Sequence, residues 1–288
     1  MLELELKKGS LFEKVLEATL DLVDQASVNC SSTGFSLRAM DTKLVAIVSL
    51  LFPSEVFERY RCDDDHSMDI SIADMVEALR CANKDDVITI MADDYNGITL
   101  TFESPKKDII AEYDLLFVDA ESHCFDIPDL QDLDSKYQAI IRMPSAEFMH
   151  ICKDLGSNCD DVVISVTKED VTFCASGESE SFRKIYRQNK TLDESEEATA
   201  THVDMREPVS LILDLSYMNS CVKLFALFDK VTICLSNTIP MMVEHKIKEK
   251  GYIRYFMAPK VEIEIEEEKE GKTENEEAGT EGNKTMQD

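Results

Sequence analysis

An internal repeat is the feature that most constrains the fold of this 288-residue chain. The first half is predicted to contain a strand, a helix, several strands, a second helix and further strands. The second half shows the same order, starting with a strand at 136–143 and a helix at 144–156. At the closest point of the repeat, Ile72, Met75, Leu79 and Arg80 align with Leu215, Met218, Val222 and Lys223. A repeated order of this kind predicts two similarly folded domains, each with two helices.

Local patterns predict where the first elements begin. Residues 1–8 alternate apolar and charged side chains, which is typical of a half-buried strand. Ser10 and Glu13 form a capping-box pattern, and Ser71 and Asp74 form a second capping pattern. Helices are therefore expected to begin at Ser10 and at Ser71.

Short apolar runs between turn residues predict the remaining strands. The pair Asn96-Gly97 is expected to form the turn of a hairpin. One further helix is expected at 215–227. The strands are expected at 34–37, 44–51, 85–94, 98–104, 160–166, 170–176, 230–236 and 241–247.

Polar segments separate the parts of the chain. Residues 117–136 are rich in Asp and too long for a tight turn, so they are expected to connect a domain at 1–116 with one at 137–260. Residues 187–202 are expected to form an exposed acidic loop. The segment 261–288 has 11 acidic and 3 basic residues, and such a composition predicts a disordered tail.

The net charge of −28 argues against a nucleic-acid partner, because phosphates attract basic surfaces. A protein that is held on DNA by topology needs only a locally favourable inner surface, so the position of the few basic residues matters more than their number. The nine cysteines include no pair with the spacing of a zinc or redox motif and are expected to be reduced. The chain shows neither a secretory signal pattern nor a membrane-spanning apolar run, so cytosol or nucleus is expected.

Five segments carry a family resemblance over nearly the whole chain. They are KGSLFEKVLEA at 8–18, GFSLRAMDTKLVAIVSL at 34–50, FERYRCDDDHSMDISIADMVEALRCA at 57–82, RMPSAEFMHICKDL at 142–155 and YIRYFMAPK at 252–260. Together they resemble the proliferating cell nuclear antigen family, the eukaryotic DNA sliding clamps.

This resemblance implies the α+β DNA-clamp (processivity) fold, with two similar domains per chain. It also implies a homotrimeric ring in which helices line the hole and antiparallel sheets lie outside. Such a protein is no enzyme and uses no cofactor or metal; it encircles double-stranded DNA in the nucleus and acts as a processivity factor in replication, repair and translesion synthesis. The implied partners are the clamp loader, DNA polymerase delta, flap endonuclease, DNA ligase and other proteins with clamp-interacting peptides, and no membrane.

Basic residues of the inner helices are implied to contact DNA phosphates, independently of base sequence. The matching positions are Lys14, Arg80, His150, Lys153 and Lys223. The resemblance also marks the segment 61–80 as DNA-binding, which adds Arg61 to the predicted contacts. The family usually has more lysine where this chain has Glu13, Leu20 and Glu77, so its inner surface is expected to be less basic than usual. Asp63–Asp65 add negative charge beside Arg61. Taken singly, each basic residue has the alternative interpretation of a solvated surface charge.

The family further implies an apolar pocket that receives a short helical peptide of a partner protein. The matching positions are Met40, Leu44, Val45, Ile47, Phe125, Ile127, Pro128, Tyr217, Pro240, Phe256, Ala258 and Pro259. Ordinary core packing is an equally good interpretation for Val45, Ile47 and Tyr217. A methionine such as Met40 suits a pocket that accepts many ligands, because its thioether side chain repacks easily.

Subunit contacts in this family run from edge strand to edge strand. Here they would pair the region 109–117 with the region 174–185 of the neighbouring subunit. The implied interface residues are Ile109, Ile110, Tyr113, Cys174, Ser176, Arg183 and Lys184. For Tyr113, Arg183 and Lys184, a routine position at a strand edge is an equally good interpretation. Lys168 matches the lysine to which this family attaches ubiquitin.

Two other classes of function compete with a replicative clamp. An enzyme is weakly supported, because the chain has no phosphate-binding glycine loop and no HExxH motif. The acidic pairs Asp93-Asp94 and Asp160-Asp161 could bind magnesium as in a nuclease, but turns usually carry such pairs for solubility. A checkpoint-type clamp subunit or a divergent paralogue would keep the fold but assemble with other chains.

Overall fold

The computed structural model describes residues 1–7, 9–93, 97–106, 108–119, 136–155, 159–177, 181–187 and 201–260. In this part of the chain, no helix is long and apolar enough to cross a membrane.

The described residues of the first half contain nine strands, two α-helices and one 3-10 helix. In order they are β1 (Leu2–Leu6), α1 (Ser10–Leu20), β2 (Gln25–Ser31), β3 (Gly34–Met40), β4 (Ala46–Pro53), η1 (Ser54–Val56), β5 (Arg59–Cys62), β6 (His66–Ser71), α2 (Ile72–Arg80), β7 (Val87–Asp93), β8 (Gly97–Ser104) and β9 (Ile109–Leu115).

The second half repeats this order. It consists of β10 (Ala139–Pro144), α4 (Ser145–Leu155), β11 (Asp161–Val166), β12 (Asp170–Ser176), β13 (Ser181–Arg187), β14 (His202–Met205), β15 (Val209–Asp214), α5 (Leu215–Ser220), α6 (Val222–Phe225), β16 (Lys230–Leu235), β17 (Met241–Ile247) and β18 (Gly251–Met257). The predicted repeat is confirmed, because the described residues of each half contain, in order, one strand, a helical element, five strands, a second helical element and three strands.

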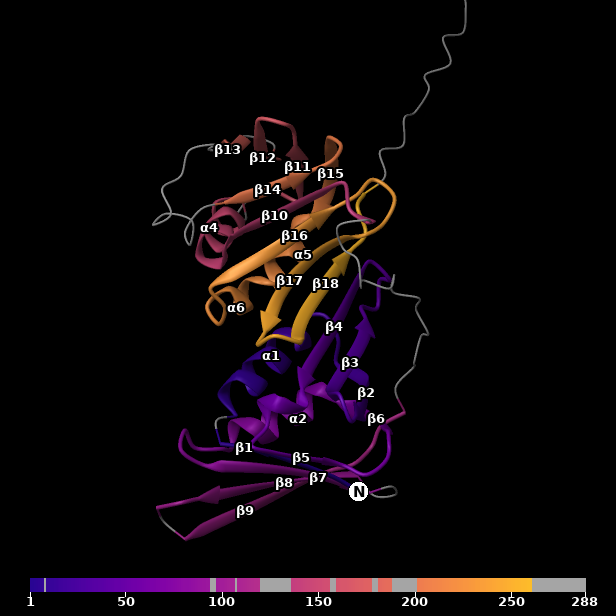
Figure 1. The fold of residues 1–288 in the computed structure, drawn as a ribbon, viewed down its shortest axis with the longest axis vertical. Helices are drawn as coiled ribbons and strands as arrows, with labels where there is room; N and C mark the ends of the chain where they lie inside the picture. The colour runs from indigo at the N-terminus through magenta and orange to yellow at the C-terminus, as the bar shows by residue number, and fades with distance from the viewer. Residues whose placement is uncertain are drawn as a thin grey trace, which may run out of the picture.

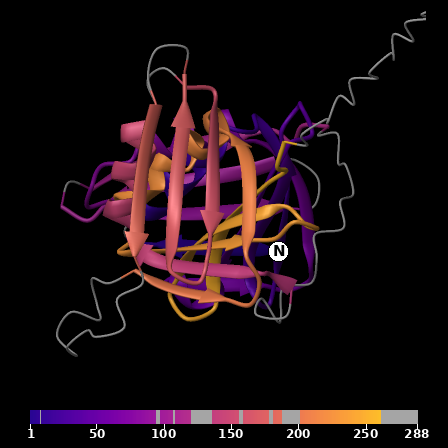
Figure 2. The same cartoon turned by 90° about the horizontal axis from the view of Figure 1, so that it is seen from above.

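The sheets repeat in the same way. The order β5-β1-β7-β8-β9 of the first half has its equivalent in β14-β10-β16-β17-β18, and β4-β3-β2-β6 has its equivalent in β13-β12-β11-β15. Two of these four units join where β18 pairs antiparallel with β4, which gives one nine-stranded sheet across both halves. The five-stranded and four-stranded sheets lie at opposite ends of the molecule (Figure 1), and Figure 2 looks down on the four-stranded end.

One hydrophobic core extends beneath the helices of both halves. Phe12 of α1 lies 5.1 Å from Phe35 and 5.0 Å from Phe52, measured between ring centroids. Phe148 of α4 similarly lies 5.1 Å from Phe225. Edge-to-face and tilted aromatic pairs of this kind add to the stabilisation from burial, so each half is held together by a phenylalanine on its first helix.

The two capping predictions have different outcomes. Ser71 is the N-cap of α2, and its hydroxyl accepts a hydrogen bond of 3.1 Å from the N–H of Asp74. The capping box at Ser10 is wrong, because Gly9 is the N-cap of α1 and no side chain caps that helix. Gly9 already has helical dihedral angles, whereas a capping side chain needs the extended backbone that Ser71 has.

The helix expected at 215–227 is also different in the structure. It is divided into α5 and α6 at Cys221, whose N–H contacts the carbonyl oxygens of Asn219 and Met218 instead of that of Tyr217. The backbone is therefore tightened at this residue, which ends the first regular helix.

Candidate functional site

The helices of both halves form one continuous layer on one side of the sheets. Helix α1 contacts α2 and α6, and α4 contacts α5 and α6, as Figure 1 shows. Their apolar faces are buried in the core. Their polar faces therefore lie together and form the surface on which DNA contacts were predicted.

Five of the six predicted DNA-binding residues belong to this layer. Lys14, Arg80, His150, Lys153 and Lys223 are all exposed on α1, α2, α4 and α6. The structure thus brings these residues together on one surface. Whether they contact DNA stays a prediction.

The electrostatics of the layer are mixed. Its described helices carry four basic residues (Lys14, Arg80, Lys153 and Lys223) and six acidic residues (Glu13, Glu17, Asp74, Glu77, Glu147 and Asp154). Two of the basic side chains form ion pairs with α1 or its C-cap. Nη2 of Arg80 lies 2.5 Å from Oε1 of Glu17, and Nζ of Lys223 lies 2.7 Å from Oδ1 of Asp21. Lys14 and Lys153 form no ion pair with the described residues.

The three positions at which less basic residues were noted behave differently. Glu77 is exposed on α2, and Glu13 is half-buried on α1. Leu20 packs against the main core, so its apolar side chain has a structural role at the end of α1.

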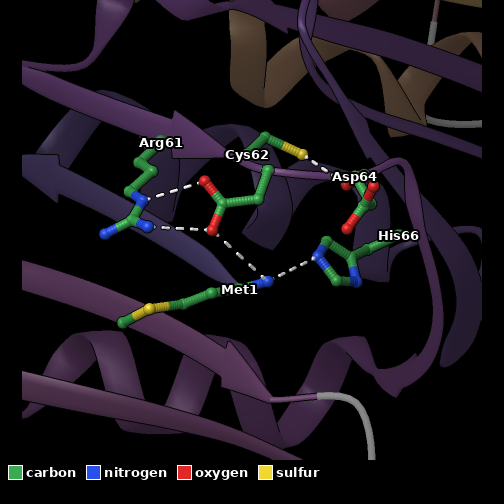
Figure 3. A network of polar contacts seen from close by, with 6 residues as sticks. Met1, Arg61, Cys62, Asp64 and His66 are labelled. Carbon is green, nitrogen blue, oxygen red and sulfur yellow. Dashed lines mark hydrogen bonds and ion pairs between the residues drawn. The ribbon is translucent and has the colours of Figure 1, made fainter.

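The sixth predicted residue, Arg61, lies outside the helix layer, on β5 at the edge of the five-stranded sheet. Its guanidinium donates two hydrogen bonds of 2.9 and 3.0 Å to the carboxylate of Asp63, which lowers the pKa of Asp63. Figure 3 shows Arg61 in one polar network with Met1 and His66, and the Nε2 of His66 lies 3.3 Å from the amino group of Met1. Arg61 is therefore already engaged by a carboxylate.

A second apolar cluster lies on the face of the nine-stranded sheet that points away from the helices. Ile253, Tyr255 and Met257 of β18 enter the main core, whereas Phe256 between them points to the opposite face. The buried members of this outer cluster are Tyr137, Ile140, Cys234, Met242 and Phe256, and Ile47 and Ile239 pack against them.

Several predicted pocket residues lie in or beside this outer cluster, whereas Val45 packs against the main core. Ile47 and Phe256 belong to it, and the carbonyl oxygen of Pro240 lies 3.3 Å from the hydroxyl of Tyr137, which donates to it. The N–H of Ala258 donates to the carbonyl oxygen of Val45 at 2.9 Å. Other predicted members are Met40 and Pro259, which are half-buried, and Leu44, which is 61% exposed. Phe125, Ile127 and Pro128 lie outside the described residues.

Tyr217 lies in the main core instead of the outer cluster. Its hydroxyl donates a hydrogen bond of 2.7 Å to Oδ2 of Asp41, which connects α5 with the loop between β3 and β4. Asp41 also accepts hydrogen bonds from the backbone N–H groups of Lys43, Val45 and Ala46. Burial alone would raise the pKa of Asp41, but these donors together hold it below its usual value. Tyr217 therefore supports the loop that carries Leu44.

Several members of the outer cluster were missed by the sequence reasoning. Tyr137, Ile140, Cys234 and Met242 had been attributed to ordinary strands, and Ile239 lies between two expected strands. A partial signal was present in the sequence of β17, where Met241, Met242 and Val243 are consecutive apolar residues, and all three are buried. A strand without apolar and polar alternation is covered on both faces.

The two strand regions expected to form subunit contacts are sheet edges. β9 ends the five-stranded sheet and β13 ends the four-stranded sheet. Ile109 and Ile110 of β9 are 55% and 64% exposed, and Ile185 of β13 is 43% exposed. Exposed apolar side chains on an unpaired edge are suited to strand addition.

The other predicted interface residues occupy different places at these edges. Tyr113 is half-buried on β9, and Arg183 is exposed on β13. Cys174 and Ser176 lie on β12, one strand inside the edge, opposite Arg183 and Ser181. Lys184 of β13 forms ion pairs of 3.1 Å with Glu147 and 3.8 Å with Asp154 of α4, so it points toward the helices.

The last predicted features are the position Lys168 and the possibility of a metal site. Lys168 is exposed in the turn between β11 and β12. Within the described parts of the chain, no three His, Cys, Asp or Glu residues lie together as a metal site would require.

Two family models match the chain, one in each half. The model of the proliferating cell nuclear antigen N-terminal domain matches residues 1–124, and that of the C-terminal domain matches residues 130–260. These ranges cover both copies of the repeated architecture, with its layer of helices and outer antiparallel sheets. The chain therefore belongs to the proliferating cell nuclear antigen family.

Proposed function

We propose that this protein is a DNA sliding clamp, a homotrimeric ring that encircles double-stranded DNA and tethers replication and repair proteins to it. Membership of the family supports a sliding clamp in DNA replication. The observation that carries the ring assembly is the junction between the two halves of the chain.

This junction is a pair of strands, and the strand that corresponds to each of them in the repeat lies at the free edge of its sheet. β18 pairs with β4 inside the chain, with Tyr255 opposite Val48. In the repeated sheet orders, β9 is the equivalent of β18, and β13 is the equivalent of β4. The contact that joins the two halves is therefore available once more between β9 of one copy and β13 of the next.

The repeat also supplies a register for this contact. Leu115 lies opposite Ile98 near the start of β8, as Met257 lies opposite Met241 at the start of β17. Tyr113 and Tyr255 each lie two residues earlier and therefore correspond to one another. Phe182 corresponds to Val48, since they lie opposite Ala175 and Ala39 in the neighbouring strands.

In this register the facing residues are chemically complementary. If Tyr113 lies opposite the partner subunit's Phe182, an antiparallel pair places Ile110 opposite the partner subunit's Ile185. It also places Glu112 opposite the partner subunit's Arg183. Apolar and opposite-charge pairs directly across two strands each stabilise a sheet by about 0.2–1 kcal/mol.

A head-to-tail contact of this kind either closes into a ring or continues as a filament. Each new junction repeats the internal one, so the rotation between successive domains is the same all around the assembly. Three subunits would contribute six such domains, with the helix layer toward the hole.

Within this ring, topology supplies most of the attachment to DNA. The net charge of −28 opposes tight binding to phosphates, and the helix layer carries mixed charges. Lys14, His150 and Lys153 offer local contacts to the DNA backbone. Retention would then depend on a closed ring, with no requirement for a base sequence or a catalytic group.

The outer cluster would receive the partner proteins. Its apolar bed of Phe256, Ile47 and Tyr137, with the exposed Leu44 at its margin, is suited to the apolar side of a short helical peptide. Partners of this kind include the clamp loader, DNA polymerase delta, flap endonuclease and DNA ligase, and the nucleus is the proposed location.

Topological retention provides the test. The full chain is loaded onto a primed circular DNA by a clamp loader, and the circle is then cut with a restriction enzyme. The clamp should stay on the intact circle and leave the linear DNA. Retention after cutting, or a solution mass that never reaches about three times 32.6 kDa, would contradict the proposal. An obligate complex with other chains would favour the checkpoint-type subunit instead.

A further inference from the structure

The two ion pairs on the helix layer have a common geometry. Arg80 comes from the last turn of α2, and Lys223 comes from α6. Both reach the intervening helix α1, where Glu17 and the C-cap residue Asp21 are four positions apart, so they lie one turn apart on the same face. The two carboxylates thus hold cations on both sides of α1.

The internal repeat indicates that this arrangement is more than a chance surface contact. Arg80 and Lys223 align with one another in the two halves of the sequence; Arg80 follows the buried Leu79, and Lys223 follows the half-buried Val222 of the second helical element. Equivalent cations are therefore neutralised by neighbouring carboxylates. By contrast, Lys14 and Lys153 have no ion-pair partner among the described residues.

We propose that Glu17 and Asp21 are positioning residues that weaken the hold on DNA, because they occupy Arg80 and Lys223 and must be displaced before a phosphate can bind there. This inference rests on the proposed encirclement of DNA and concerns how firmly the inner surface holds it. A phosphate and a carboxylate compete for the same donors of Arg80 and Lys223.

The exposure of the pairs makes such an exchange easy. The side chains of Arg80 and Lys223 are each about half exposed, so water reaches both ion pairs. Exposed ion pairs are weak, and their charges are screened by salt. Each cation can therefore pass from a carboxylate to a phosphate and back, which favours a ring that moves along DNA over one that stays in place.

The test uses the double variant Glu17→Gln/Asp21→Asn, which keeps the shape of both side chains but removes their charges. Binding of the full chain to a short fluorescent duplex is measured at several salt concentrations between about 50 and 200 mM. The variant should bind more tightly, by up to about fivefold for each freed cation. Its plot of log K against log salt should become steeper by up to about 0.9 for each additional phosphate contact.

A matched control separates this effect from a simple change in net charge. Asp204→Asn/Glu207→Gln removes the same number of charges at the β14 edge, where Asp204 is paired with Arg142 and Glu207 with Gln138. It should leave the salt slope unchanged. Adding Arg80→Gln and Lys223→Gln to the first variant should abolish its gain. Thermal unfolding and solution mass confirm that the variants remain folded and assembled.

The outcomes distinguish this inference from the proposed function. If the wild-type protein is retained on closed circles but the first variant gains neither affinity nor slope, the role of Glu17 and Asp21 is wrong and the clamp function stands. An equal gain in the control would also overturn it. If the wild-type protein is not retained on circles and binds no duplex, the proposed function itself fails.

Discussion

At the scale of single residues, His245 is a buried titratable group that links stability to pH. Its ring is fully buried, lies 5.3 Å from Phe225 and stacks on Phe228 at 5.1 Å. Nδ1 lies 3.2 Å from the carbonyl oxygen of Lys230, whereas Nε2 has no hydrogen-bond partner among the described residues. Burial lowers the pKa of His245 from 6.5 to about 4.

This shift predicts a loss of stability in mild acid. Above pH 6.5 the histidine is neutral in both states, but between pH 6.5 and 4 the unfolded chain takes up a proton that the folded chain does not. The free energy of unfolding should therefore fall by about 2 kcal/mol between pH 7 and pH 5 through this residue. Urea unfolding of wild type and His245→Phe over that range measures the difference, with the exposed His150→Gln as control. Equal pH slopes in wild type and His245→Phe would contradict the prediction.

A second residue-scale prediction concerns the hydrogen bond from Tyr217 to Asp41. Tyr217→Phe removes one donor from a largely buried carboxylate, so the loop with Leu44 should be held less firmly. Affinity for a peptide with the clamp-interaction motif should fall by about fivefold, corresponding to roughly 1 kcal/mol. Isothermal titration calorimetry with this peptide measures the affinities of wild type and variant.

The matched control is Tyr60→Phe, which removes a hydroxyl that donates to the carbonyl oxygen of Ser31 at 2.7 Å. Ser31 ends β2, beside the start of β3, whereas the β3–β4 loop follows the other end of β3. If both variants lose the same affinity, the effect is general destabilisation and Tyr217 has no specific role at the loop.

At the scale of elements, the starts of α1 and α2 offer a direct comparison of two serines. Ser71 caps α2 through its hydroxyl, whereas Ser10 is the first helical residue of α1 and caps nothing. Ser71→Ala should lower the free energy of unfolding by about 1 kcal/mol, and Ser10→Ala should change it little. Thermal or urea unfolding of the two variants tests this. A larger loss from Ser10→Ala would contradict it.

The same elements show what the sequence can and cannot predict. The alternation in β1 and the cap at Ser71 depend on neighbouring residues, so the local sequence was sufficient for both. The predicted cap at Ser10 was wrong, because the helical dihedral angles of Gly9 place the start of α1 one residue earlier than a capping Ser10 requires. The division of the last helix at Cys221 was missed. Tyr137 of the outer cluster was missed because its burial depends on Met242 and Phe256, which are distant in the sequence.

At the scale of the whole molecule, the repeat was visible in the sequence, but its geometric consequence was not. The order of strands and helices predicted two similar halves. Only the sheet topology shows that β18 and β4 join them, with Met257 opposite Ala46. That pairing brings together segments about two hundred positions apart, so no local pattern could indicate it.

The register derived from that junction leads to a charge-exchange prediction. Glu112 should face the partner subunit's Arg183, with the apolar pair of Ile110 and the partner subunit's Ile185 beside it. Glu112→Lys or Arg183→Glu alone places like charges opposite one another, which destabilises the strand pair. Each single variant should shift the solution mass from trimer toward monomer at micromolar concentration, as measured by analytical ultracentrifugation.

The double variant Glu112→Lys/Arg183→Glu restores opposite charges at the junction and should recover the trimer. Glu103→Lys is a useful control, since Glu103 is an exposed residue on β8, one strand inside the same sheet. It changes the charge equally but leaves the edge strand intact, so the trimer should persist. If both single variants assemble normally, or if the double variant remains monomeric, the register taken from the internal junction is wrong. Recovery in the double variant alone would show that the contact between subunits repeats the contact between the two halves.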